Sequence, residues 1–166
     1  MATPQQLPFL NKSADAAFRF LGVPTSVRSN AEATRGALGL IEHWEMPVGF
    51  ATPHHTHHRE DESFYIIEGE FAIICGGRWQ KAGPGAFVYG PREIPHGFKV
   101  IGKSPARMLV LCTPAGFEHF MLEQATPIGE PPSPPDMGTL ITLAAKYGID
   151  IHGPLPEAPP FLQANG

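Results

Sequence analysis

The chain has 166 residues, and its 12 basic and 16 acidic side chains give a formal net charge of −4 at pH 7. This length fits one domain with a substantial core, and the acidic balance disfavours a protein that binds nucleic-acid phosphates. Glycine (18 residues) and proline (19 residues) are abundant although 42% of the residues are hydrophobic, which argues against a helical bundle and predicts short strands joined by frequent turns.

Residues 1–20 lack both the basic start and the continuous apolar run of a secretory signal. No stretch of the chain approaches the about 18 apolar residues of a membrane span. The two cysteines, Cys75 and Cys112, lie far apart in the sequence and do not form a disulfide framework, so they are expected to be free, buried thiols. We therefore expect a cytoplasmic protein without a membrane or nucleic-acid partner.

The elements expected along the chain begin with an extended N-terminal arm over residues 1–35, where apolar residues follow no sustained period. The next segment, residues 37–46, alternates as a strand, and one face carries Leu38, Leu40, Trp44 and Met46. Further β-rich runs, separated by turns, are residues 63–67, 71–75, 86–89, 97–101 and 108–112. This spacing is typical of sandwiches and barrels, so an all-β domain is expected over residues 36–125.

The C-terminal part, residues 126–166, predicts a proline-rich linker, one short amphipathic helix and a flexible tail. Asp136 is placed as the N-cap of this helix, and Gly148 is placed as its stop. Apolar residues recur at helical spacing at Met137, Leu140, Ile141 and Ala144. We expect the helix on the exterior of the β-domain or at a dimer contact, with the tail beginning at Pro154.

A dense histidine cluster occupies residues 54–58, where four of five residues are histidine. Residues two apart on a strand project to the same face, so His55 and His57 can chelate one ion. A helix would instead pair His54 with His58, but the preceding proline and the flanking strands weigh against a helix here. The alternative to a metal site is a solvated, pH-sensitive loop.

The spacing around these histidines resembles the first motif of the cupin superfamily: Gly49, five residues, His55-x-His57, four residues, Glu62, six residues and Gly69. The second cupin motif is matched less fully by Gly85, Pro91 and His96, with Glu93 and Val100 where the family usually has glycine and asparagine. The resemblance implies an antiparallel β-barrel of the double-stranded β-helix, or jelly-roll, type. It also implies one divalent transition metal (Fe, Mn, Ni, Co, Cu or Zn), held by His55, His57, Glu62 and His96.

The remaining polar residues of this region are not selected by the motif. Glu60 and Asp61 are expected to be solvent-facing turn residues. Two further histidines, His54 and His58, are expected at the barrel rim or in contact with the ligands. Ordinary surface or packing positions are expected for His43, His119 and His152.

A substrate pocket follows from the face on which the ligands lie. If Glu62 points inward, Phe64 and Ile66 share its face, and Phe98 shares the face of His96. These apolar side chains would line a dry pocket that suits a hydrophobic or aromatic substrate. The alternative is that they are simply core residues of a small barrel.

The segment Thr113–Phe120, followed by the proline-rich linker and helix, resembles single-domain cupins of the quercetin-dioxygenase-like group. This resemblance implies a metal-dependent dioxygenase that acts with O₂ on a flavonol-like or other enolisable aromatic substrate, with Glu62 as catalytic proton acceptor. Two alternatives stay open. One is a metal-dependent isomerase or epimerase of a sugar-like or keto-acid substrate, and the other is a non-catalytic module that binds a small molecule. A homodimer is expected, because pairing would cover an exposed sheet edge.

Overall fold

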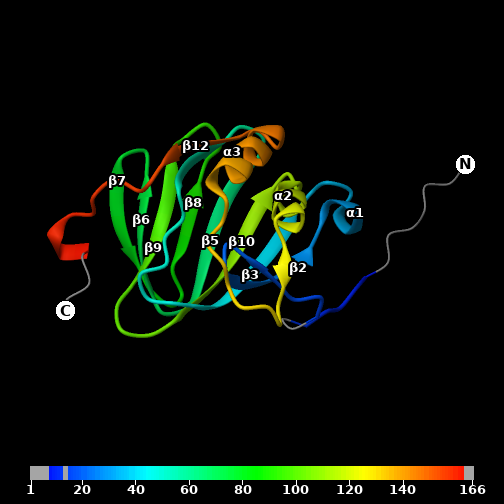
Figure 1. Cartoon of the computed structure of the whole chain (residues 1–166), viewed down its shortest axis with the longest axis horizontal. Helices are drawn as coiled ribbons and strands as arrows, with labels where there is room; N and C mark the ends of the chain where they lie inside the picture. The colour runs from blue at the N-terminus through cyan, green and yellow to red at the C-terminus, as the bar shows by residue number, and fades with distance from the viewer. Residues whose placement is uncertain (1–7, 13–14, 163–166) are drawn as a thin grey trace, which may run out of the picture.

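The computed structural model describes residues 8–12 and 15–162, and most of them form two antiparallel β-sheets (Figure 1). The larger sheet has the strand order β11 (Thr126–Pro127), β1 (Phe18–Phe20), β2 (Val23–Ser29), β3 (Gly39–Met46), β10 (Ala106–Thr113), β5 (Asp61–Glu68) and β8 (Phe87–Gly90). The smaller sheet has the order β12 (Ile149–Gly153), β4 (His54–His57), β9 (His96–Ile101), β6 (Glu70–Cys75) and β7 (Arg78–Ala82). The predicted all-β character is confirmed.

The strands β5 and β10 carry the hydrophobic core on one face each. Phe64 and Ile66 of β5 are buried, whereas Tyr65 between them is exposed. On β10, Met108 and Val110 are buried with the same period of two. Burial of these alternating side chains, each worth about 2 kcal/mol, fixes the register because a shift by one residue would expose the apolar face.

The strand β3 contains a bulge that changes which side chains face inward. His43 pairs with Met108 and Met46 with Ala106, so three steps along β3 match two along β10. Glu45, within this stretch, has a φ of +50°. The expectation that Met46 shares a face with Leu38, Leu40 and Trp44 is therefore wrong. Ile41, Glu42, His43 and Met46 are buried, whereas Leu38, Leu40 and Trp44 are only half-buried.

The expected extended arm over residues 1–35 is wrong for residues 18–29, which form β1 and β2 and pair into the larger sheet. Val23 and Thr25 of β2 are buried there. The pairing of β2 with β3 joins residues 11 to 18 positions apart, so no local period in the sequence predicts it. A short helix, α1 (Ala31–Thr34), follows with the side chain of Asn30 as its N-cap. The rest of the arm that the sequence predicts, residues 1–7 and 13–14, lies outside the described residues.

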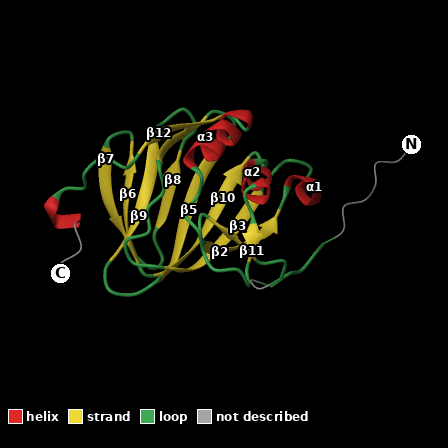
Figure 2. Cartoon of the chain, viewed as in Figure 1, coloured by secondary structure: helices red, strands yellow, loops and turns green. Residues whose placement is uncertain are grey.

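Two helices beyond α1 lie near one another along one side of the strands (Figure 2): α2 (Phe117–Glu123) and α3 (Met137–Lys146). The α3 helix confirms the predicted one, since Asp136 accepts hydrogen bonds from the N–H groups of Gly138 and Thr139. The sequence predicted α3 alone and missed α1 and α2, which have four and seven residues and are too short for a clear helical period.

The expected flexible tail from Pro154 is wrong for residues 154–162. A 3-10 turn, η1 (Pro160–Leu162), ends the described chain, and Leu162 is buried in a small cluster with Ala72 and Ile101. Its burial anchors this segment against the smaller sheet. Residues 163–166 of the predicted tail lie outside the described residues.

The strand ladders between described residues stay within each sheet, so the expected closed barrel is two separate antiparallel sheets in this structure. The jelly-roll topology and the domain boundaries remain predictions.

Both Cys75 and Cys112 are free, and Cys112 is buried whereas Cys75 is half-buried. None of the helices in the described ranges offers an apolar stretch sufficient for crossing a bilayer.

Candidate metal centre

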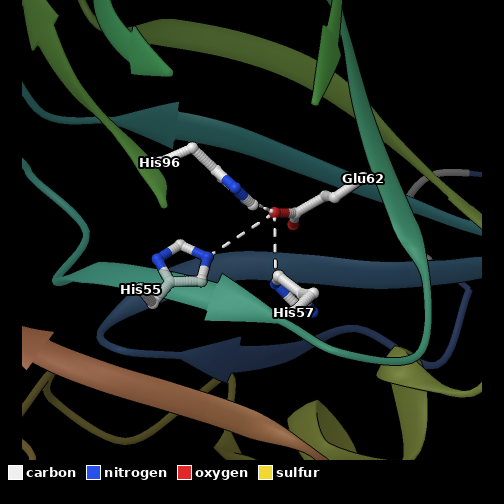
Figure 3. Close-up of side chains that lie close together, drawn as sticks. All are labelled: His55, His57, Glu62 and His96. Carbon is white, nitrogen blue, oxygen red and sulfur yellow. Dashed lines mark hydrogen bonds and ion pairs between the residues drawn. The ribbon is translucent and has the colours of Figure 1, made fainter. Parts of the chain in front are cut away.

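The four residues predicted as metal ligands come together from three strands (Figure 3). His55 and His57 lie on β4 and project from the same face of this strand. His96 is the first residue of β9 and pairs directly with His55 across the smaller sheet. Glu62, near the start of β5, reaches the cluster from the larger sheet. The two sheets thus meet through the charged side chain of Glu62.

The donor atoms of this cluster all lie within 4.8 Å of one another. The Oε2 atom of Glu62 is 2.8 Å from Nε2 of His96, 3.3 Å from Nε2 of His57 and 3.6 Å from Nε2 of His55. His57, His96 and Glu62 are buried, and His55 is half-buried. The spacing that predicted these four residues therefore selects a real cluster in space.

Each histidine of the cluster is oriented through its Nδ1 atom. Nδ1 of His55 lies 2.8 Å from the carbonyl oxygen of Pro53, and Nδ1 of His96 lies 2.9 Å from that of Ile94. Because a carbonyl oxygen only accepts, these Nδ1 atoms carry the hydrogen and donate it. The Nε2 atoms are left to face Glu62, which is the arrangement in which a histidine offers its lone pair to a metal.

The third histidine, His57, is oriented by a carboxylate instead. Its Nδ1 atom lies 2.7 Å from Oε1 of Glu60, whose side chain is buried. The expectation that Glu60 faces solvent is wrong, because the turn after β4 folds it back behind His57. The three-residue spacing from His57 is the signal that could have identified it. Asp61 instead accepts hydrogen bonds from Arg92.

The electrostatics of the cluster centre on Glu62. Burial by itself would raise the pKa of Glu62, but the charge of His57 and hydrogen bonds from the histidines lower it well below its ordinary value. Burial likewise opposes protonation of His57, yet the charge of Glu62 and the hydrogen bond with Glu60 raise its pKa to about 9. Burial lowers the pKa of His55 to about 4 despite Glu62. The carboxylates of Glu60 and Glu62 thus stabilise the positively charged form of His57.

These properties fit a divalent transition metal. Three imidazoles and one carboxylate are a donor set that suits Fe, Mn, Ni, Co, Cu or Zn, and the same set does not decide between them. The Nε2 atom of His57 is buried and lies 3.3 Å from Oε2 of Glu62, but it forms no hydrogen bond of regular geometry with any described residue. A buried donor or acceptor without a partner costs about 1–3 kcal/mol, and coordination would remove that cost.

An apolar cavity opens onto this cluster, and its lining includes His55 and Glu62. Its walls come from β1 and β2, from α2 and α3, and from β12. Among the described residues that line it, His43, Thr52, His55 and Glu62 carry polar side chains, and none is lysine or arginine. The cavity is therefore suited to a mainly apolar molecule.

The three predicted pocket residues are all buried, but they differ in position. Phe98 lines the cavity, whereas Phe64 and Ile66 belong to the core and are absent from the described lining. The ring of Phe64 packs edge-on against that of Phe98, with centroids 5.6 Å apart. A role of these three residues in binding substrate remains a prediction. Sequence reasoning missed His43, which lines the cavity from β3.

The remaining histidines lie outside the ligand cluster. His58 is exposed and bonds Glu93 and Asp150, with distances of 2.8 and 2.9 Å. His54 lies beside His152, with ring centroids 5.7 Å apart. His119 pairs with Glu32 at the surface. His119 thus occupies a surface position, as expected, whereas the roles expected for His54 and His58 at the barrel rim or beside the ligands remain predictions.

Comparison with known proteins gives a consistent picture of the fold. Residues 42–112 match a family model described as Cupin domain. An uncharacterized protein of Methanocaldococcus jannaschii, MJ1618, is 30% identical over 74 residues, which are 45% of this chain and 58% of the relative's length. All four clustered residues fall within the range of the family match.

Two solved structures extend the similarity to three dimensions. KdgF from Halomonas sp. superposes with a TM-score of 0.55 at 20% identity, over 67% of this chain and 96% of that one. An RmlC-like cupin from Shewanella frigidimarina gives a TM-score of 0.56 at 18% identity, over 69% and 98% of the two chains. Residues 42–112 thus resemble a cupin domain and contain a possible metal site, and the overall fold is similar to that of solved cupins.

Proposed function

We propose that this chain is a metal-dependent dioxygenase that acts on a flavonol-like or other enolisable aromatic compound. The observation that carries the proposal is the apolar cavity, free of lysine and arginine in its described lining, that opens onto Glu62 and His55. An aromatic substrate would bury its rings against this lining, while an acidic hydroxyl group would face the polar cluster.

The side chains of the centre have distinct roles in this proposal. His55, His57, His96 and Glu62 would hold the metal, which supplies Lewis acidity toward the substrate oxygen and redox chemistry with O₂. Glu62 is ionised, because its pKa lies well below the ordinary value, and in this proposal its carboxylate would be the acceptor for the proton of the substrate hydroxyl. The apolar walls exclude water from the reacting groups.

An isomerase or epimerase of a sugar-like or keto-acid substrate is the first alternative. Such substrates carry anionic or many hydroxyl groups, which call for basic and polar side chains. The nearest candidates are committed elsewhere: Arg92 binds Asp61, and Arg59 donates to the carbonyl oxygen of Lys146. Neither lines the cavity. The second alternative is a module that binds a small molecule without turnover, since a fold does not by itself confer activity.

The test uses protein loaded separately with Mn, Fe, Co or Ni, to which quercetin is added without oxygen before air is admitted. We expect a shift of the quercetin spectrum on binding, followed by oxygen uptake equal to the loss of substrate, because both atoms of O₂ enter the product. A zinc-loaded sample is the control, since zinc is redox-inert. The absence of both signals in all four forms would remove flavonols as substrates. Conversion of the added compound without oxygen uptake favours the isomerase. Binding of the compound without formation of a product favours the non-catalytic module.

A further inference from the structure

His43 is an imidazole in the cavity that lies outside the metal cluster. It sits on β3, next to the bulge, and pairs with Thr25 of β2 and Met108 of β10. It is 6% exposed and lines the same cavity as His55 and Glu62. Its ring stacks near that of Phe20, with centroids 6.4 Å apart. The side chain is thus fixed in place and reaches the space that a ligand would fill.

A hydrogen-bond chain sets the tautomer of His43. The hydroxyl of Thr25 donates its single hydrogen to the carbonyl oxygen of Val23 at 2.9 Å. The oxygen of the same hydroxyl lies 2.8 Å from Nδ1 of His43. Because its hydrogen is already donated to Val23, this oxygen accepts the hydrogen bond from His43. Nδ1 of His43 therefore carries the hydrogen, and Nε2 carries a lone pair.

This lone pair is available to a ligand. Nε2 of His43 makes no hydrogen bond to any described residue. Burial lowers the pKa of His43 to about 4, although the charges of Glu62 and Glu42 act to raise it, so the ring is neutral near pH 7. The other cavity imidazole, His55, is committed through Nδ1 to Pro53 and through Nε2 to the metal cluster.

We infer that His43 is a substrate-binding residue whose Nε2 accepts a hydrogen bond from a hydroxyl group of the substrate, separate from the oxygen that faces Glu62. This inference rests on the proposed function in that it places the substrate in the same cavity. It adds that the substrate is an aromatic compound with a second, phenol-like hydroxyl group. Thr25 is a positioning residue, since it acts by fixing the tautomer of His43.

The test uses zinc-loaded protein with ¹⁵N-labelled histidine, and phenol and toluene as a matched pair of probes. We expect the nitrogen spectrum to show His43 with hydrogen on Nδ1. Phenol should shift the Nε2 signal of His43, and toluene should leave it in place. In Thr25→Val, which lacks the hydroxyl, the tautomers should mix, and Thr25→Ser should restore the single form.

The binding measurement is made on His43→Phe, which keeps an aromatic ring but lacks the acceptor. Phenol should bind about five-fold more weakly to this variant than to the wild type, as expected for one neutral hydrogen bond, while toluene affinity stays the same. An unmoved Nε2 signal with phenol in the wild type would overturn the inference, as would an unchanged ratio of phenol to toluene affinity in His43→Phe.

These outcomes separate the inference from the proposed function. A protein that shows the phenol effect but neither binds nor oxidises quercetin refutes the flavonol dioxygenase and supports His43 as a hydroxyl-binding residue. A protein that oxidises quercetin but shows no phenol effect at His43 retains the proposed function and overturns the inference.

Discussion

Oε1 of Glu60 lies 2.7 Å from Nδ1 of His57, and both side chains are buried. The other two histidines of the cluster contact backbone carbonyl oxygens through Nδ1, so His57 is the one backed by a full negative charge. A carboxylate in this position makes the imidazole a stronger ligand and fixes its orientation. The buried centre thereby contains two carboxylates, Glu60 and Glu62, whose charges would together balance a divalent cation.

The variant Glu60→Gln should therefore weaken metal binding about ten-fold, because the amide keeps the size of the side chain but lacks its charge. Competition with a chelating dye at fixed pH measures this change. Glu93→Gln is the matched control, since Glu93 bonds His58, which is not a ligand. Equal zinc affinity in Glu60→Gln and the wild type would contradict the predicted role.

Gly90 of β8 is the partner of Glu62 across the larger sheet. A Cβ atom at this position would clash with the backbone carbonyl oxygen of Glu62. We expect Gly90→Ala to displace the start of β5, to lower stability by about 1–3 kcal/mol and to weaken metal binding. Gly83→Ala is the control, because its Cβ would meet no atom within 4 Å. Urea unfolding and dye competition should leave the control unchanged, and equal behaviour of the two variants would refute this steric account.

The four candidate ligands could be predicted from sequence because two of them are related by local geometry and the resemblance to the cupin motifs implied the other two. His55 and His57 share a strand face by period alone, and the motif spacing located Glu62 and His96. His43 was not predictable in the same way. Its entry into the cavity depends on pairing with Thr25 and Met108 and on the bulge at Glu45, which are decided by contacts between distant segments.

The pKa of His43, lowered by burial to about 4 from 6.5, predicts a pH effect on stability. Between these two values the unfolded chain binds a proton at His43 and the folded chain does not, so the free energy of unfolding falls as the pH decreases. Relative to His43→Phe, the wild type should lose about 2 kcal/mol between about pH 7.5 and pH 5. Urea titrations under identical metal conditions measure this difference, and a constant gap between the proteins would disprove it.

His58 follows directly after β4 and forms hydrogen bonds with Glu93 and with Asp150 of β12. Hydrogen bonds with Asp150 and Glu93 raise its pKa above the ordinary value of 6.5. Asp150→Asn should bring the pKa of His58 back down, since it removes the first of these partners. An NMR titration of zinc-loaded protein measures the midpoint, with Glu45→Gln as a remote control. A midpoint that does not respond to Asp150→Asn would show that the ion pair does not form in solution.

The outer face of β5 and the edge strand β8 exposes three aromatic side chains: Tyr65, Phe87 and Tyr89. An exposed apolar patch on an unpaired edge favours association. We predict a homodimer whose interface buries this patch. The variant Phe87→Glu should be a monomer, and its circular dichroism spectrum should be the same as that of the wild type. Light scattering of both proteins decides the matter, and a monomeric wild type would rule the dimer out.

The four candidate ligands come from one part of the chain, and much of the cavity wall comes from other parts. The four clustered residues fall between residues 55 and 96, whereas much of the wall comes from β1, β2, α2, α3 and β12, all of which lie outside the matched range 42–112. Exchange of the two terminal segments would therefore replace part of the cavity wall and leave the four clustered residues and His43 in place. A chimera that receives both terminal segments of a related protein would acquire part of that protein's cavity shape and keep this chain's His43 and candidate metal site.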